Sequence, residues 1–249
     1  MTADVQAMAD GLWRVPTSAS NAYLWRTRTG GFVVVDPGLY GDETIVQDAL
    51  VSLGATAADV RTIVLTHFHS DHAGAAAALA GITGAPIGAG FRDAAVLRGD
   101  VPRPLPDLTA AERPLYDLIA AAHPENMEAP RCTVSLELEH GDPVDDDGDM
   151  VVHAVTGHTW GSIALHLPRQ AVVLTGDIAI TGHDGAPAPG PFNVDRVRAR
   201  RALARLAALK PRVAGLGHGA PLLGDAHETL AALAGGTPPP QRPRADPPP

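Results

Sequence analysis

Short apolar runs alternate with stretches of helical period along the first half of the chain. Each apolar run ends in polar or Gly-rich turn residues, as strands in a sheet do. The segment 42–53 instead carries its apolar residues at helical spacing on one stripe. This alternation of strand and helix is typical of an α/β fold. The predicted elements are strands at 11–15, 22–26, 32–35, 62–65 and 86–88, with helices at 42–53 and 73–80.

The pattern changes between residues 91 and 130, where prolines interrupt it and 110–122 is the one good helical segment. We interpret 91–130 as a helical insertion in a single domain that spans 1–236. The tail 237–249 is mostly Pro and is expected to be disordered or in polyproline II. Between these segments we predict strands at 133–138, 150–155, 163–167, 172–174 and 213–216, and helices at 194–209 and 225–234.

The amino-acid composition excludes several classes of site and partner. The chain of 249 residues has 11 His and a single Cys, so an internal disulfide and a thiolate zinc cage are excluded. A net charge of −9 argues against nucleic acid as a partner. We find no signal peptide or membrane span in the sequence and expect a cytoplasmic protein with a small-molecule substrate. The oligomeric state stays open, with a homodimer as one option.

A dense group of potential metal ligands follows the predicted strand at 62–65. His67, His69, Asp71 and His72 lie within six residues. Residues two apart in an extended segment point to the same side, so His67 and His69 can converge on one ion, and the turn after them directs Asp71 and His72 to a neighbouring position. Imidazole and carboxylate suit zinc, manganese or iron, and four such groups exceed what one open tetrahedral ion takes. Two adjacent metal ions are therefore expected.

Three more candidate ligands stand in the second half of the chain. His158, Asp177 and His218 each follow a predicted strand and each has Gly beside it. Glycine is required where backbone must approach closely, and the carboxyl ends of strands are where α/β sheets place their sites. We therefore expect these residues to complete the two-metal site.

With these motifs the chain resembles the metallo-β-lactamase fold superfamily of metallo-hydrolases, over about residues 11–234. The resemblance implies a four-layer αββα sandwich with the site at one edge of two facing sheets. The motifs that carry it are Val35-Asp36-Pro37-Gly38, the segment 66–74, Gly157-His158-Thr159-Trp160-Gly161-Ser162, Thr175-Gly176-Asp177 and Gly217-His218-Gly219.

The resemblance also implies a division of the ligands between the two ions. The first metal would be held by His67, His69 and His158, and the second by Asp71, His72 and His218. Asp177 would bridge them together with a hydroxide. Asp36 would orient a ligand from behind, as carboxylates do for metal-bound imidazoles.

Departures from the family pattern narrow the range of possible substrates. Members that hydrolyse β-lactams usually have Cys or Ser where Asp177 stands, which disfavours β-lactamase activity. Diiron flavoprotein members typically have Glu where His69 stands. Trp160 replaces a common Pro and would alter the pocket wall, and we take it with His183 and Phe192 as candidate substrate contacts.

Our hypothesis is a dinuclear metal-dependent hydrolase in which metal-bound hydroxide attacks an ester, thioester or lactone. Zinc is the expected metal, with iron or manganese as alternatives. Asp71 and Asp177 are the catalytic candidates, because these ligands can also relay a proton. Two alternatives stay open: a mononuclear iron dioxygenase of the same fold acting on a persulfide, and a non-catalytic binding protein on this scaffold.

Overall fold

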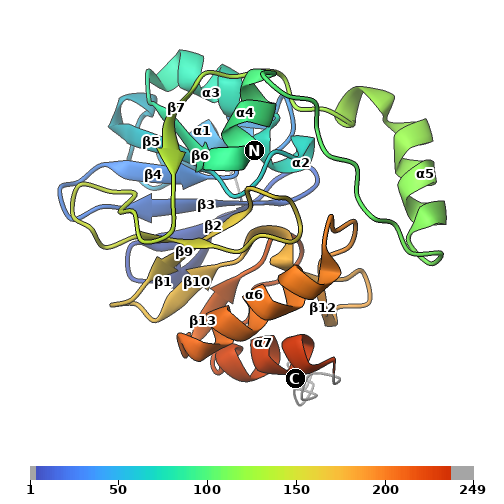
Figure 1. The fold of residues 1–249 in the computed structure, drawn as a ribbon. Coiled ribbons are helices and arrows are strands. Elements are labelled where there is room, and N and C mark those ends of the chain that lie inside the picture. Colours follow the sequence, from blue (N-terminus) through green and yellow to red (C-terminus); the bar gives the residue numbers. More distant parts are fainter. Residues whose placement is uncertain (1–3, 237–249) are drawn as a thin grey trace, which may run out of the picture.

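Two β-sheets face each other in the computed structural model, which describes residues 4–236. The predicted tail at 237–249 lies outside these residues. Figure 1 shows the larger sheet above the smaller one, with helices on the outer face of each. In the larger sheet the strands lie in chain order, antiparallel from β1 to β4 and parallel from β4 to β7. Its strands are β1 (Gln6–Ala9), β2 (Leu12–Pro16), β3 (Asn21–Arg26), β4 (Phe32–Val35), β5 (Val60–Leu65), β6 (Ile87–Gly90) and β7 (Val134–Leu138).

The smaller sheet has the order β13-β10-β9-β8. Because β9 runs antiparallel to both of its neighbours and β13 runs parallel to β10, the strands β8, β10 and β13 all end at the same edge. A separate two-stranded ribbon follows β10. The strands of this half are β8 (Val151–Ala154), β9 (Ile163–Leu167), β10 (Val172–Leu174) and β13 (Val213–Gly215), and the ribbon is β11 (Ala179–Thr181) with β12 (Pro187–Pro189).

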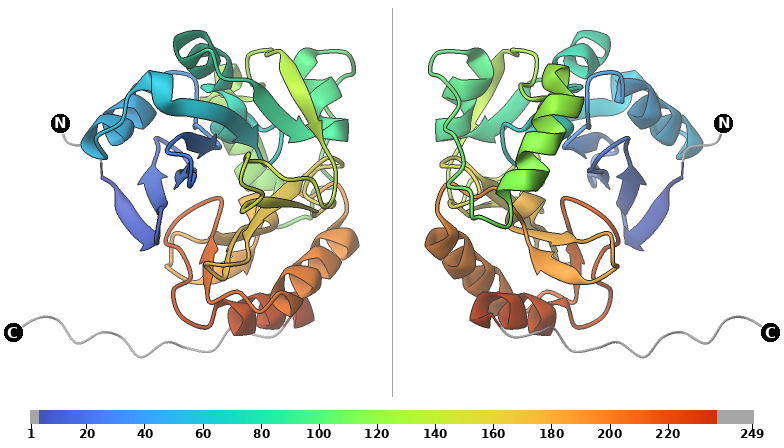
Figure 2. Two further views of the ribbon diagram at one scale, coloured as in Figure 1. Left: turned by 90° about the vertical axis from the view of Figure 1, so that its left-hand side faces the viewer. Right: turned by 90° about the vertical axis from the view of Figure 1, so that its right-hand side faces the viewer.

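Helices complete the outer layers. In the views of Figures 1 and 2, α1, α3 and α4 cover the larger sheet, α6 and α7 cover the smaller one, and α5 lies beside the open edge of both. None of the helices within residues 4–236 combines the length and apolar content that crossing a bilayer requires. The helices are α1 (Glu43–Ser52), α2 (Ser70–Ala73), α3 (Ala76–Thr83), α4 (Phe91–Arg98), α5 (Arg113–Ala122), α6 (Arg196–Ala208) and α7 (Ala226–Gly235), with short 3₁₀ turns η1 (Ala57–Asp59), η2 (Pro124–Asn126) and η3 (Gly176–Ile178).

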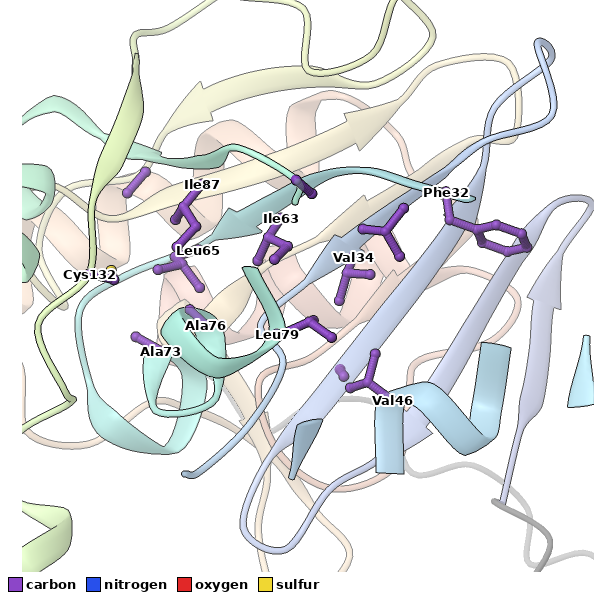
Figure 3. Packing of buried hydrophobic residues seen from close by; sticks show 14 of the residues in the cluster. Phe32, Val34, Val46, Ile63, Leu65, Ala73, Ala76, Leu79, Ile87 and Cys132 are labelled. Atoms are coloured by element: carbon purple, nitrogen blue, oxygen red, sulfur yellow. The ribbon is translucent and has the colours of Figure 1, made fainter. Parts of the chain in front are cut away.

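The alternation of side chains along β4 explains why its sequence is continuously apolar. Phe32 and Val34 pack on the helix side of the larger sheet with Val46 of α1, in the core drawn in Figure 3. Val33 and Val35 of the same strand belong to the core between the two sheets. A strand buried on both faces has no polar side to show, as is usual where helices cover a sheet.

A third core lies between the smaller sheet and its helices. Leu203 and Leu206 of α6 pack there with Leu230 of α7 and Val173 of β10. Three apolar cores separate four layers, so the predicted αββα sandwich is confirmed. Full burial of a leucine side chain contributes about 1.5–3 kcal/mol, so these cores stabilise both sheets.

Several elements were not predicted. The strand β1, the helix α4 and the ribbon β11–β12 have no counterpart among the predicted elements. Within the predicted insertion at 91–130, Ala94 and Leu97 of α4 are buried in the helix-side core, because the prolines begin only at Pro102 and leave 91–98 free to form a packed helix. The segment that projects from the sandwich therefore begins after α4 and contains α5, none of whose residues is buried.

Candidate metal centre

The seven residues predicted as metal ligands converge at the edge where strands of both sheets end. The larger sheet contributes His67 and His69, which follow β5, together with Asp71 and His72 on the single turn of α2. The smaller sheet contributes the other three. His158 follows β8, Asp177 lies in η3 after β10, and His218 follows β13.

His67, His69 and His158 form a symmetrical group of three imidazoles. Each pair of ring centroids is 4.7 Å apart, and the ring planes meet at 86° to 90°. His158 Nε2 lies 3.0 Å from His69 Nδ1, and His67 Nε2 is buried without a hydrogen-bond partner. Burial and the neighbouring histidines hold the pKa of His67 well below its usual value, and burial lowers the pKa of His69 to about 3. The group thus offers neutral imidazoles, which is the form that binds metal.

Asp71, His72, Asp177 and His218 form a second group beside the first. His218 Nε2 lies 3.2 Å from Asp177 Oδ2 and 3.3 Å from Asp71 Oδ2. His72 Nε2 lies 3.2 Å from Asp177 Oδ1 and 3.4 Å from His218 Nε2. Burial by itself lowers the pKa of His218, but the carboxylates of Asp177 and Asp71 raise it to about 10. The second group therefore attracts positive charge.

The outer nitrogens of this second group fix which ring atoms face inward. His72 Nδ1 donates a hydrogen bond to Asp36 Oδ2 (2.9 Å), and His218 Nδ1 donates to the backbone oxygen of Ala19 (2.8 Å). When both rings are neutral, their Nε2 lone pairs point at each other and at two carboxylates. Either protons on the rings or a bound cation would offset the repulsion among these acceptors.

Asp177 contacts both groups. Its Oδ2 lies 3.2 Å from His218 Nε2 and 3.8 Å from His158 Nε2. The backbone approaches it closely, since a Cβ at Gly217 would overlap Asp177 Oδ1. In each group the possible ligand atoms all lie within 4.8 Å of one another. Imidazole and carboxylate in this arrangement fit divalent metal ions.

Asp36 lies behind the centre, in the position that the family resemblance implied. Its carboxylate accepts hydrogen bonds from Thr66 N (2.7 Å), Thr66 Oγ1 (2.6 Å) and His72 Nδ1. The residue has φ 51°, a left-handed conformation that Asp tolerates better than most residues. It thereby joins the end of β4 to the loop that carries the first histidines.

Asp93 of α4 was missed at the sequence level, although it joins two ligand loops. Its carboxylate accepts hydrogen bonds from Phe68 N (3.2 Å), Thr159 Oγ1 (2.6 Å) and Gly161 N (2.8 Å). Phe68 stands between the first two histidines, and Thr159 follows His158. Burial raises the pKa of Asp93 to about 7 although all three hydrogen bonds lower it. In the sequence, the one feature that could have pointed to Asp93 is its acidic side chain next to the apolar positions of a helix.

Five of the seven metal-centre residues line a cavity of about 720 Å³, namely His69, Asp71, His158, Asp177 and His218. Of the predicted substrate contacts, His183 and Phe192 line this cavity. Trp160 does not belong to its described lining residues. Instead the Trp160 ring lies 5.7 Å from the guanidinium carbon of Arg198 on α6.

Comparison with known proteins places this geometry in a family. The chain is 24% identical over 242 residues to the probable metallo-hydrolase YflN of Bacillus subtilis (strain 168), covering 87% of this chain and 86% of that protein. The crystal structure of the metallo-beta-lactamase family protein TTHA1429 from Thermus thermophilus matches with a TM-score of 0.67 and 24% identity, over 92% of this chain and 80% of that one. TTHA1623, solved in a di-iron-bound form, matches with a TM-score of 0.61 and 25% identity, over 86% of this chain and 96% of that one. A sequence model of the metallo-beta-lactamase superfamily matches residues 15–218, and the chain therefore belongs to that superfamily.

Proposed function

We propose that the protein is a hydrolase with two divalent metal ions, zinc in the first instance, that cleaves an ester, thioester or lactone of a small molecule. The observation that carries this proposal is the pair of adjacent ligand groups, five of whose members line one cavity. Adjacent ion sites beside a substrate-sized cavity are the usual arrangement of two-metal hydrolases.

The ligands divide between two positions. His67, His69 and His158 would hold one ion, Asp71, His72 and His218 the other, and Asp177 both. Bound there, two divalent ions would lower the pKa of a water molecule and polarise the scissile carbonyl.

The chain's own carboxylates supply the proton transfer. Asp71 and Asp177 both line the cavity, with side chains 27% and 8% exposed, so each can be reached by substrate. A carboxylate in this position can accept a proton from the attacking water and return it to the leaving group. His218 lies within 3.3 Å of both and restrains their orientation.

A cysteine nucleophile does not fit this site. Cys132 is buried in the core between the larger sheet and its helices, and burial raises its pKa to about 11. A thiol in such surroundings is unreactive. The hydrolytic reaction therefore relies on the histidine and carboxylate cluster.

The relatives support the same class. YflN is named a probable metallo-hydrolase, and TTHA1623 was solved in a di-iron-bound form, which keeps iron among the candidate metals. The mononuclear iron dioxygenase stays the alternative prediction. The second group, with two carboxylates and two histidines, favours two ions over one.

The test is a substrate panel assayed on protein before and after chelation. We expect hydrolysis of at least one ester, thioester or lactone, its loss on chelation, and its return on adding zinc, manganese or iron. Phosphodiester and β-lactam substrates serve as comparison classes. Metal-free protein that kept full esterase activity would contradict the proposal.

A further inference from the structure

Helix α5 shows an apolar face that no other part of the described chain covers. None of its residues is buried, and Leu115, Leu118 and Ile119 are 49%, 65% and 38% exposed. An amphipathic helix ordinarily packs its apolar side against a core. Figure 2 shows α5 standing beside the open edge of the sandwich, where it belongs to neither helical layer.

Part of this apolar face lines the cavity that ends at the metal centre. Leu115, Tyr116 and Ile119 contribute from α5, and Ile180 and Phe192 contribute from the segments that follow Asp177. At about 720 Å³ the cavity has the size of an ordinary small-molecule site. Its apolar part and its ligand-bearing part are therefore continuous.

Specific contacts hold α5 in this place. The Glu112 carboxylate pairs with Arg196 at the start of α6 and accepts a hydrogen bond from Phe192 N (3.2 Å). The Tyr116 and Phe192 rings meet edge to face with centroids 5.4 Å apart. A second link joins Asp107 N to the backbone oxygen of Asn193 (2.9 Å). The helix is thus attached to the segment 192–196, of which Phe192 also lines the cavity.

Two basic side chains that line the cavity away from the metal centre are paired with carboxylates. Arg103 lies 3.4 Å from Glu128, and His123 lies 3.5 Å from Glu125. The surroundings of α5 therefore fit a neutral apolar group better than a charged one, because a charged group would lose its hydration without gaining a free partner.

We propose that the part of the cavity lined by Leu115, Ile119 and Phe192 is an acyl-chain site. The inference rests on the proposed function. The substrate is an ester, thioester or lactone whose carbonyl reaches Asp71 and Asp177 while a neutral alkyl chain packs against Leu115 and Ile119. Burial of this chain covers the apolar face that α5 otherwise exposes to water.

The first experiment measures kcat/KM for 4-nitrophenyl acetate, butyrate, hexanoate and octanoate on the protein as purified. Each buried methylene should raise kcat/KM about fourfold, which corresponds to about 0.8 kcal/mol. Rates that stay flat or fall from acetate to octanoate would overturn the acyl-chain site.

A pair of variants on the same helix tests where the chain binds. In the double variant Leu115→Ser/Ile119→Ser the ratio of octanoate to acetate hydrolysis should fall at least about tenfold, because two apolar contacts are lost. Leu118→Ser is the matched control, since Leu118 is exposed on α5 but does not line the cavity. Its ratio should equal that of the wild type. An equal loss in both variants, or in neither, would contradict the assignment.

Binding of amides tests the acyl-chain site separately from hydrolysis. Octanamide and acetamide titrated calorimetrically into the same protein should differ in affinity, and Leu115→Ser/Ile119→Ser should remove the difference. Chain-dependent binding without hydrolysis of any substrate would support the acyl-chain site and refute the hydrolase. Hydrolysis without chain-dependent binding would support the hydrolase and refute the acyl-chain site. A dimer that both Leu118→Ser and the double variant dissociate would assign the apolar face to a second copy and overturn the inference.

Discussion

The metal centre and the α5 side of the cavity share one space but are held in different ways. The ligands follow strand ends, most of them are buried, and hydrogen bonds such as those of Asp36 and Ala19 orient their rings. The α5 side chains stand on a helix outside both sheets and remain exposed. The packed scaffold therefore fixes the positions of the metal ligands, whereas the projecting segment with α5 can determine which substrate binds.

The largest effect is expected from the removal of one buried ligand. His67→Ala deletes a nitrogen that has no hydrogen-bond partner within the protein. We expect loss of metal and a fall in hydrolysis of about 10³-fold or more, since bound metal contributes several kcal/mol to the transition state. Elemental analysis and ester hydrolysis measure the two effects. His140→Ala, a change at an exposed histidine, is the control and should retain both. Normal metal content in His67→Ala would refute its role as a ligand.

A smaller effect is expected behind the centre. Asp36→Asn keeps the size of the side chain but removes the charge that His72 and Thr66 share. Loss of such a partner typically costs about 10–100-fold in metal affinity. Competition with a chromophoric chelator would give the affinity of each protein. An affinity equal to that of the wild type would show that the orientation of His72 does not depend on Asp36.

Asp93 allows a test by pH. Its pKa of about 7 in the folded protein lies above the ordinary value, so the folded state binds more protons than the unfolded state between these values. The stability that this residue contributes is therefore present at low pH and is lost as the pH rises through about 7. Urea unfolding should show a free-energy difference between wild type and Asp93→Asn that shifts against the wild type from about pH 5 to about pH 8. A difference independent of pH would contradict the buried, proton-binding state of Asp93.

The smallest effect is expected at the attachment of α5. Glu112→Gln weakens the pair with Arg196 but keeps a hydrogen-bond acceptor for Phe192 N. Partly exposed ion pairs contribute about 0.2–1 kcal/mol, so kcat/KM for octanoate should fall by less than about tenfold. Metal content should not change, because Glu112 touches none of the ligands. A variant that lost metal would show that the two regions are coupled.

The α/β alternation and the candidate ligands could be predicted from the sequence because their signals are local, whereas the four αββα layers followed only from the family resemblance. His67, His69, Asp71 and His72 lie in one short segment, and the other ligands stand beside glycines after apolar strands. The apolar run of β4 is likewise typical of a strand buried on both faces. Such patterns can be read without knowing which segments meet in space.

The features that the sequence did not predict depend on tertiary contacts. Asp93 is a single carboxylate in a helix, and only the folded chain shows that it meets Phe68 and Thr159. The position of α5 depends on the pairing of Glu112 with Arg196, residues 84 apart in the chain. Trp160, predicted as a pocket wall, turns toward Arg198 because α6 packs beside its loop.

The number of metal ions bound per chain distinguishes a two-metal centre from a one-metal centre. Protein purified without chelators or added metal would be examined by elemental analysis, and its metal content expressed per chain. The two ligand groups predict two divalent ions per chain, and both should be lost on His67→Ala or Asp177→Asn together with hydrolysis. One iron per chain with no second metal, or an active protein without metal, would contradict the two-metal hydrolase.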